Sequence, residues 1–431
     1  MMKFSMKSFR LAGLALVLTL GMGLSGLSQS IQSTILGAVK DQSGAAVSGA
    51  TVEVLNQGTN FVRKLTTDEN GDYRVPNLEP GRYSVTVVAS GFRRWVRAEI
   101  VLDSNQIRRV DTDLQIGDIN NTVSVTATET PVATETATLS NVKTAREFNQ
   151  LPMSVFGRAF TNITSVTAAV QSSNNQIVVN GARDSANNFT SDGVSVNDII
   201  SSRQMPNGFQ MEIESFRVIK VQTAYNSAEY PQVAQFIGVS KSGENTPHGS
   251  VYWGNFNTIF SARSFFDRAD PSFINHNLFS GTFGAPVYIP KLYNGRNKTF
   301  FFFGYGGSRF RVGARRFLSV PTAAFRNGDF SSIASRITIR DPETGLPFTD
   351  NKIPASRISP VSRALQDLLY PDPNRAHAAL GDFGVNQNYT ADPGSKFNSD
   401  VYTVRVDQKI SDTNTMFVRY GYTHHNQNVN P

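Results

Sequence analysis

The runs VYTVRVDQKI (residues 401–410) and TMFVRYGYTH (residues 415–424) decide the fold class of this chain. Successive side chains of a β-strand point to opposite faces, so alternation of apolar and polar residues predicts a strand with two unlike faces. The apolar positions are Tyr402, Val404, Val406, Ile410, Met416, Val418, Tyr420 and Tyr422, and the polar positions are Thr403, Arg405, Asp407, Lys409, Thr415, Arg419 and Thr423. The SDTN segment between the runs predicts a hairpin turn.

Two kinds of protein use such strands. A water-soluble sandwich turns the apolar face to its core, whereas a transmembrane barrel turns it to lipid and carries aromatic residues near the strand ends. The chain has 30 Phe and 13 Tyr but only 17% charged residues, which is aromatic-rich and charge-poor for a water-soluble protein. We therefore expect these runs to be strands of an outer-membrane barrel.

Residues 1–30 have the layout of a secretory signal peptide. Lys3, Lys7 and Arg10 precede an apolar stretch at residues 11–20, and small residues follow it. The apolar stretch is shorter than the ~20 residues of a spanning helix, and no later stretch is apolar enough to be one. We expect the chain to be exported and not to be held by a helix.

The composition limits the chemistry. The chain has no cysteine, which excludes disulfides, thiolate metal sites and a lipid-modified cysteine. A net charge of +7 raises the question of nucleic acid, but no basic helix, zinc pattern or stacking motif supports it. Residues 291–316 contain basic residues and no acid. Solvated loops are the simpler interpretation of this segment, and contact with anionic lipid head groups or an anionic ligand is the other.

Residues 34–116 predict a small β-sandwich, because short alternating segments are separated by turn signals every 8–12 residues. Within them, Asp68, Asn70 and Asp72 have the spacing of the first calcium ligands of an EF-hand. Tyr73 stands where that loop needs glycine, so we expect a tight hairpin, with calcium as the lesser alternative.

GAVKDQSGAAVSGATVEV (residues 37–54) and TTDENGDYRVPNLEPGRYSVTVVASGF (residues 66–92) resemble the carboxypeptidase regulatory-like domain. The resemblance implies a prealbumin-like β-sandwich, a fold grouped with carbohydrate-binding-like domains. It is a resemblance to the accessory module and not to the peptidase, because no histidine of this chain begins the H-x-x-E zinc motif.

Three later segments are similar to the plug domain and first barrel strand of TonB-dependent outer-membrane receptors, and most of all to the long Oar-like receptors. They are residues 146–170, residues 176–199 and residues 213–253. One departure is residues 231–235, PQVAQ, which stand where relatives usually have a Gly-Gly pair, so the backbone of the last plug strand is expected to differ locally from that of the family. Asn180-Gly181 and Ser191-Asp192-Gly193 predict hairpin turns, and Arg183 with Asp184 is our candidate for a charged bridge from plug to barrel wall.

The resemblance implies a mainly β fold in parts. Residues 34–116 would be the sandwich, residues 117–246 a linker and an α+β plug, and residues 247–431 part of a transmembrane antiparallel β-barrel. At ~10 residues per strand plus loops, the last part supplies about five to eight strands, against about 22 in the family. We therefore expect a C-terminally truncated fragment. Residues 357–370 predict one helix, in an outer loop.

The resemblance also implies a function. In this family a receptor of the Gram-negative outer membrane takes up a large or scarce ligand, and a TonB-type protein anchored in the inner membrane supplies the energy by gripping a short extended segment, the TonB box, through strand addition. Our candidate for that segment is Thr122, Val123, Ser124, Val125, Thr126 and Ala127. A passive linker or a first plug strand is an equally good interpretation of the same residues.

The partners implied are therefore a TonB-type coupling protein, outer-membrane lipid and an extracellular ligand that the sequence does not identify, a glycan among the candidates. We find no catalytic arrangement, P-loop or metal motif, and we expect neither an enzyme nor a bound cofactor. The rival function is a cell-surface carbohydrate-binding or adhesion protein, in which the front sandwich binds a glycan and nothing is transported.

Overall fold

The computed structural model describes residues 32–118, 122–125, 135–150, 167–173, 176–197, 212–226, 232–262, 273–313, 316–375, 387–391, 393–412 and 414–429. The predicted signal peptide lies outside these residues. The chain divides into two compact units, of which the first holds the described residues up to 253 with 279–306 and 400–424, and the second holds 254–278, 307–399 and the residues from 425. Among the described helices, none is both long and apolar enough to cross a membrane.

The first unit begins with two packed sheets, which we call the front sandwich. One sheet pairs β1 (Ser33–Asp41) with β4 (Asp72–Leu78) on one side and with β7 (Ile107–Arg109) and β8 (Thr112–Leu114) on the other. The other sheet has the order β3 (Val62–Thr66), β2 (Thr51–Asn56), β5 (Gly81–Val88), β6 (Arg94–Leu102) and β9 (Thr122–Val125). The structure thus contains the sandwich that the turn spacing predicts.

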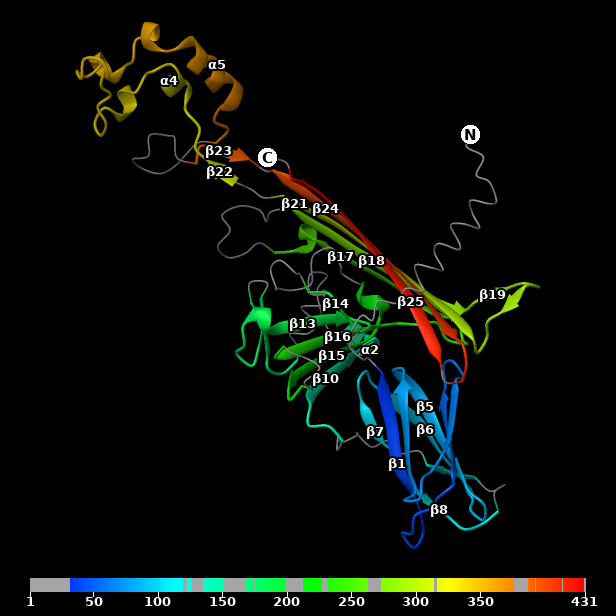
Figure 1. Ribbon diagram of the computed structural model, residues 1–431. Coiled ribbons are helices and arrows are strands. Elements are labelled where there is room, and N and C mark those ends of the chain that lie inside the picture. Colours follow the sequence, from blue (N-terminus) through cyan, green and yellow to red (C-terminus); the bar gives the residue numbers. More distant parts are fainter. Residues whose placement is uncertain are drawn as a thin grey trace, which may run out of the picture. The chain divides into compact units, whose positions relative to one another are not determined.

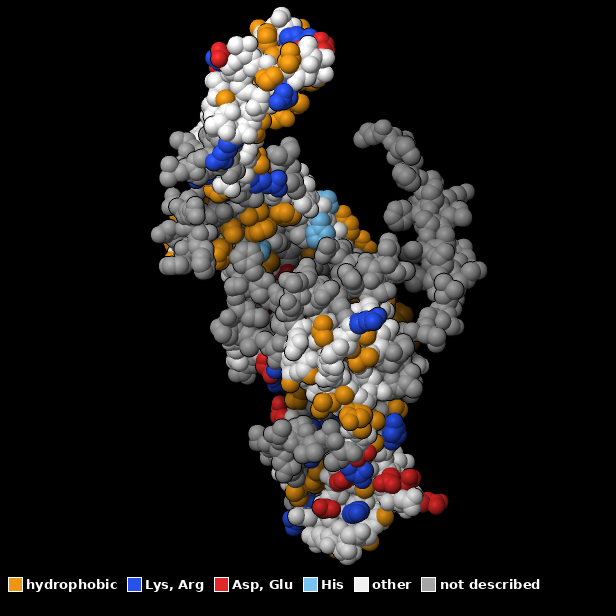
Figure 2. All heavy atoms as spheres, turned by 90° about the vertical axis from the view of Figure 1, so that its left-hand side faces the viewer, with side chains coloured by type: hydrophobic (Ala, Val, Ile, Leu, Met, Phe, Trp, Pro, Cys, Tyr) orange, Lys and Arg blue, Asp and Glu red, His pale blue; other side chains and the backbone are white. Residues whose placement is uncertain are grey.

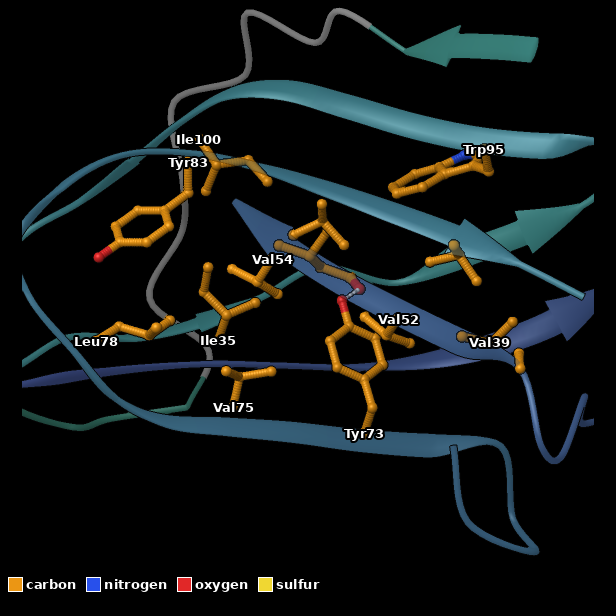
Figure 3. Packing of buried hydrophobic residues seen from close by; sticks show 14 of the residues in the cluster. Ile35, Val39, Val52, Val54, Tyr73, Val75, Leu78, Tyr83, Trp95 and Ile100 are labelled. Carbon is orange, nitrogen blue, oxygen red and sulfur yellow. Dashed lines mark hydrogen bonds between the residues drawn. The ribbon is translucent and has the colours of Figure 1, made fainter. Parts of the chain in front are cut away.

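The core of the front sandwich follows from alternation along its strands. Val52 and Val54 of β2 are fully buried, and in Figure 3 they face Ile35 and Val75 of the opposite sheet. The hydroxyl of Tyr73 donates a hydrogen bond of 2.7 Å to the carbonyl oxygen of Val110, drawn as a dashed line in Figure 3. A buried tyrosine needs such an acceptor, since an unpaired hydroxyl in an apolar core is costly.

The residues with calcium-like spacing form a turn. The Oδ1 atom of Asp68 accepts hydrogen bonds from the backbone N–H groups of Asn70 (2.9 Å) and Asp72 (2.8 Å). Gly71 has a φ of 77°, a conformation that glycine adopts without strain. The carboxylate of Asp68 therefore closes the hairpin before β4, as the interpretation as a turn predicts.

A central α+β region follows, which we call the central domain. Its sheet has the order β10 (Leu139–Thr144), β15 (Phe216–Ala224), β16 (Ala234–Ser240), β13 (Asn187–Ser191) and β14 (Val194–Ser195). The smaller elements are β11 (Val170–Ser173), β12 (Gln176–Val179), α2 (Ala145–Gln150), η2 (Asp184–Ala186) and η3 (Ile213–Ser215). Phe189 and Phe236 stack in the core with ring centroids 4.6 Å apart. β16 begins within the PQVAQ departure, at Ala234, and its residues 234–238 pair with β13 without a shift in register.

Five long strands form a third sheet, the long sheet. In order they are β17 (His248–Asn257), β18 (Ile274–Pro286), β21 (Thr299–Gly313), β24 (Gly394–Lys409) and β25 (Thr415–Val429). Each strand lies beside its neighbour in sequence, which is the meander expected of barrel strands. Figure 1 shows these strands running side by side, with the short pair β19 (Tyr288–Ile289) and β20 (Tyr293–Asn294) at one end. Among the described residues the long sheet is open.

The second unit contains η4 (Thr258–Phe260), which lies between β17 and β18, and the long connection between β21 and β24. The elements of that connection are β22 (Arg316–Leu318), α4 (Ala323–Arg326), η5 (Ser331–Ile333), η6 (Thr349–Asn351), η7 (Ala355–Arg357), α5 (Pro360–Leu369) and β23 (Tyr389–Ala391). The buried amide of Asn351 holds the loop together by donating to the carbonyl oxygens of Phe330 (2.8 Å) and Ile337 (3.0 Å). The helix predicted within residues 357–370 is present as α5.

Candidate functional site

The candidate coupling segment is part of the front sandwich. β9 pairs with β6 in parallel register, Arg94 opposite Thr122 and Arg97 opposite Val125. The side chain of Val123 packs against the sandwich core, whereas those of Thr122 and Ser124 are exposed. Residues 122–125 are therefore extended, as predicted, but they form a docked strand and neither a free linker nor a strand of the central sheet. Thr126 and Ala127 lie outside the described residues.

β9 is the last strand of its sheet. Among the described residues one of its edges pairs with β6 and no strand pairs with the other. An edge strand presents backbone N–H and C=O groups with which a further chain can form a ladder. The geometry is thus suited to strand addition at β9 while the front sandwich stays intact.

The side chain that links the central domain to the long sheet is that of Asp192. It lies in the turn between β13 and β14, where Asp192 and Gly193 have φ values of 49° and 84°. Its side chain is 2% exposed, and its Oδ1 atom accepts a 2.8 Å hydrogen bond from the backbone N–H of Ser240. Its Oδ2 atom lies 2.8 Å from Nε of Arg419, and its Oδ1 atom lies 3.6 Å from Nη1 of Arg405.

Arg405 is the centre of this ion cluster. Its side chain is 3% exposed, and its Nη2 atom lies 2.6 Å from a carboxylate oxygen of Asp407. Nη1 donates to the Ser240 hydroxyl at 3.0 Å, and Glu79 of the front sandwich lies 3.9 Å from Nη2. The guanidinium also lies over the ring of Phe417, 4.2 Å from its centroid. A guanidinium so deeply buried is tolerated because its charge and donors are matched on several sides.

Sequence reasoning did not find Asp192, which makes the ion pairs. Of the pair named as candidates, Arg183 is exposed just before η2, and Asp184 begins η2. The Asp-Gly pair at Asp192 fits a hairpin turn, and that interpretation is also correct. The alternation in β24 did place Arg405 on the polar face of the strand, but its partner Asp192 lies more than 200 residues earlier in the chain and leaves no local pattern.

Two glycines of β21 allow the central domain to approach the long sheet. A Cβ atom on Gly304 would collide with the Ser215 side chain, and one on Gly306 would collide with Glu212. Phe300 and Phe302, on the same inward face, are completely buried. The segment TFFFFGYGG is therefore packed against the central domain on one face.

The front sandwich contacts the central domain mainly through polar groups. Lys220 of β15 donates from Nζ to the carbonyl oxygens of Ser104 (2.9 Å) and Asn105 (3.0 Å). Arg217 donates to the carbonyl oxygen of Pro80 at 2.8 Å and pairs with Glu244 at 3.0 Å. Burial lowers the pKa of Lys220 to about 8, and the nearby Asp103 carboxylate opposes the shift.

Comparison with known families agrees with this architecture. Residues 34–115 match the carboxypeptidase regulatory-like domain, and residues 239–431 match an outer membrane beta barrel domain. The TonB-dependent transporter Oar of Myxococcus xanthus is 26% identical over 300 residues, which cover 66% of this chain and 27% of that protein. The chain is a homologue of the TonB-dependent transporter Oar. The resemblance to Oar-like receptors is thereby confirmed, and the chain spans about a quarter of that relative's length.

Similar solved structures are remote. A catechol 1,2-dioxygenase from Acinetobacter is 15% identical with a TM-score of 0.19, covering 24% of this chain and 61% of that one. A putative carbohydrate binding protein from Bacteroides uniformis is 22% identical with a TM-score of 0.17, covering 19% of this chain and 40% of that one. Likenesses this slight carry no information on function.

Proposed function

We propose that this chain acts as a TonB-dependent receptor of the outer membrane, which takes up a large or scarce ligand that remains to be identified. In this proposal residues 34–116 are a periplasmic front domain, residues 117–246 are a linker and plug, and residues 247–431 are membrane-spanning strands. The homology to Oar and the outer membrane beta barrel match support it. The observation that carries it is the way β24 and β25 distribute burial.

Burial along β24 is the reverse of that in a water-soluble sheet. Tyr402, Val404 and Val406 are 38–40% exposed, whereas Arg405 and Asp407 are 3% and 7% exposed. In water the hydrophobic effect would favour the opposite orientation, because exposed apolar area is unfavourable and buried charge is costly. Hydrocarbon outside and a polar, protein-filled interior make the same arrangement favourable. The orientation therefore supports lipid contact over a soluble sandwich.

The neighbouring strands repeat the pattern. On β17, Val251 and Trp253 are 89% and 68% exposed. On β25 the four residues of the predicted apolar face, Met416, Val418, Tyr420 and Tyr422, are all exposed. The Tyr402 ring lies 5.0 Å from that of Tyr305 on β21, which gives an aromatic contact between adjacent strands. Aromatic residues in such a band are typical of barrels at the membrane interface.

Energy coupling would act on β9. This strand is the last of the front sandwich in sequence and precedes the central domain, and its free edge fits strand addition by a TonB-type protein. A pull on β9 would reach the central domain, which is tied to the long sheet by the ion cluster around Asp192. We propose residues 122–127 as the TonB box on this basis.

The rival function, carbohydrate binding or adhesion by the front sandwich, has less support. A cavity lined by Tyr83, Glu79 and Asp412 has a volume of about 30 Å³, which is room for a water molecule. On the face shown in Figure 2, acidic and basic side chains are intermixed at the lower end of the view. We therefore favour the receptor.

Cell fractionation tests the proposal. We expect the full-length receptor in the outer membrane after carbonate washing, which removes peripherally bound proteins. A matched variant carrying Val404→Asp and Val418→Asp on the exposed apolar face should be lost from that fraction, because charge at lipid-facing positions is strongly unfavourable. Recovery of the unaltered chain in the soluble periplasm would refute the proposed location.

A further inference from the structure

The hairpin that joins β18 to β21 exposes a compact apolar surface. It comprises β19, β20 and the residues between them, and four of its side chains are solvent-exposed. They are Tyr288 (65%), Ile289 (46%), Leu292 (80%) and Tyr293 (38%). Figure 1 shows the hairpin projecting from the ends of the long strands, away from the strands of the central domain. We call residues 287–298 the basal hairpin.

The basal hairpin is built to hold this shape. The backbone N–H of Val287 donates to the Thr299 carbonyl oxygen at 2.9 Å, and that of Gly295 donates to the Val287 carbonyl oxygen at 2.8 Å. At the tip, Lys291 has a φ of 62° and the Leu292 N–H donates to the Ile289 carbonyl oxygen at 3.1 Å. The apolar side chains are therefore presented by an ordered turn.

The charge of the basal hairpin has one sign. Residues 287–298 include Lys291, Arg296 and Lys298 and contain no aspartate or glutamate. The three basic side chains are exposed. Tyrosine and aliphatic side chains beside lysine and arginine are the composition of a segment at the boundary between hydrocarbon and lipid head groups.

The basal hairpin joins β18 and β21, and both strands carry exposed aromatic side chains on the face that we assign to lipid. Phe283 of β18 and Phe303 of β21 are 47% and 41% exposed, and the Phe283 ring lies 5.7 Å from that of Phe301. At its base, Asn297 accepts hydrogen bonds from Asn60 of the front sandwich (3.1 Å) and from Asn245 (2.7 Å). The hairpin thus belongs to the end of the sheet that carries the front sandwich, which is the periplasmic end in the proposed function.

From these observations we infer that the basal hairpin is a membrane-interface anchor. It inserts Tyr288, Ile289 and Leu292 at head-group depth into the periplasmic leaflet of the outer membrane, and Lys291 and Arg296 contact the phosphates of anionic glycerophospholipids. The inference rests on the proposed outer-membrane location, and it adds a lipid class and the residues that recognise it. Attraction of each basic side chain to an anionic membrane surface would bind the hairpin to that surface more tightly than apolar contact alone.

Site-directed spin labelling tests the anchor, because the chain has no native cysteine. The full chain would be reconstituted into vesicles with Leu292→Cys labelled at the hairpin tip. Val404→Cys labels the exposed face of β24, and Glu69→Cys labels an exposed turn of the front sandwich. We expect the label at residue 292 to be accessible to oxygen and shielded from a water-soluble nickel complex, at a depth between those of the other two labels.

The three labels separate the possible failures. If the label at 404 lies in lipid while the label at 292 is as exposed to nickel as that at 69, the anchor is refuted and the proposed location stands. If the label at 404 is also in water, the proposed location itself fails. A label at 292 that neither oxygen nor nickel reaches would show a protein contact, which also overturns the anchor.

Lipid composition tests the role of charge. In vesicles containing phosphatidylglycerol, Lys291→Gln with Arg296→Gln should raise nickel accessibility at residue 292 several-fold. In phosphatidylcholine vesicles the same double variant should change it little. An equal response in both lipids would refute the contact with anionic phosphates, and Lys64→Gln on the front sandwich is the control for a general loss of charge.

Discussion

Replacing Asp192 with asparagine should weaken the attachment of the central domain to the long sheet. The change leaves Arg405 and Arg419 buried while removing the carboxylate that both face. If asparagine keeps its oxygen toward the Ser240 N–H, its amide nitrogen points at Arg419, so a donor faces a donor. Asp192→Asn therefore removes an attraction and adds a mismatch at the same place.

The magnitude follows from the geometry. The Oδ2 to Nε distance of 2.8 Å puts the centres of the two charges roughly 4 Å apart, where a pair at an effective dielectric constant of ~20 gains about 4 kcal/mol. Removing one partner of a buried pair costs about 3–5 kcal/mol by mutational experience. Arg405 keeps Asp407, so we expect the lower part of this range, about 3 kcal/mol.

Hydrogen exchange followed by mass spectrometry measures the effect. A loss of about 3 kcal/mol corresponds to roughly 150-fold faster exchange in peptides that cover β13 and β16, provided that these strands exchange by local opening. The control is Asp113→Asn, which alters an exposed carboxylate on β8 and should leave exchange in β13 and β16 unchanged. A double-mutant cycle with Arg419→Gln should give a coupling of about 2 kcal/mol. Exchange within about fivefold of the unaltered chain, or a coupling below about 0.5 kcal/mol, would refute the reasoning.

Three further predictions concern the front sandwich and its contacts. Val125→Pro should abolish uptake in the full receptor and leave ligand binding intact, because proline removes a backbone donor from β9. The control variant Val125→Ala keeps the donor and should transport normally. Transport by both variants at normal surface levels would place the coupling segment elsewhere. The free energy of unfolding should rise between about pH 8 and 10.5, because in that window Lys220 is protonated in the unfolded state and mostly deprotonated in the folded state. In Lys220→Met this part of the rise should be absent from urea titrations. An identical pH profile for the two proteins would count against a buried lysine with a lowered pKa. The fragment 32–125 should fold alone with β-type circular dichroism. It should be about 1 kcal/mol more stable than the fragment 32–116, since it includes β9 and the packing of Val123. Equal unfolding midpoints of the two fragments would show that β9 does not dock.

Pattern in the sequence predicted the parts of the fold that depend on neighbouring residues. The two faces of β24 and β25 are those that the alternation gives, because side-chain direction in a strand is a local property. Alternation alone is symmetric, however, and could not say whether Val404 or Arg405 faces inward. Burial in the structure resolves that ambiguity, since Arg405 is enclosed and Val404 is not.

Contacts between distant segments could not be predicted from the sequence, for a different reason. The parallel pairing of β9 with β6 involves backbone groups, so it places few demands on side-chain identity. The ion pair from Asp192 to Arg419 likewise depends on a turn that many sequences can form. Within the run Phe300–Phe303 of β21, Phe300 and Phe302 are completely buried whereas Phe303 is 41% exposed, a division that depends on what packs against each face.

The parallel pairing of β9 has a mechanical consequence. Parallel strands held by a row of hydrogen bonds resist tension along their common axis, because the row bears the load together and yields in shear. Tension across that axis instead loads the hydrogen bond at the end of the row first, so the bonds break one after another. A partner strand that adds along β9 and draws it lengthwise would therefore meet its greatest resistance before the front sandwich releases the strand, and a partner that draws it sideways would meet the least. The direction of the pull would therefore decide whether the front sandwich resists the force first or transmits it directly to the central domain.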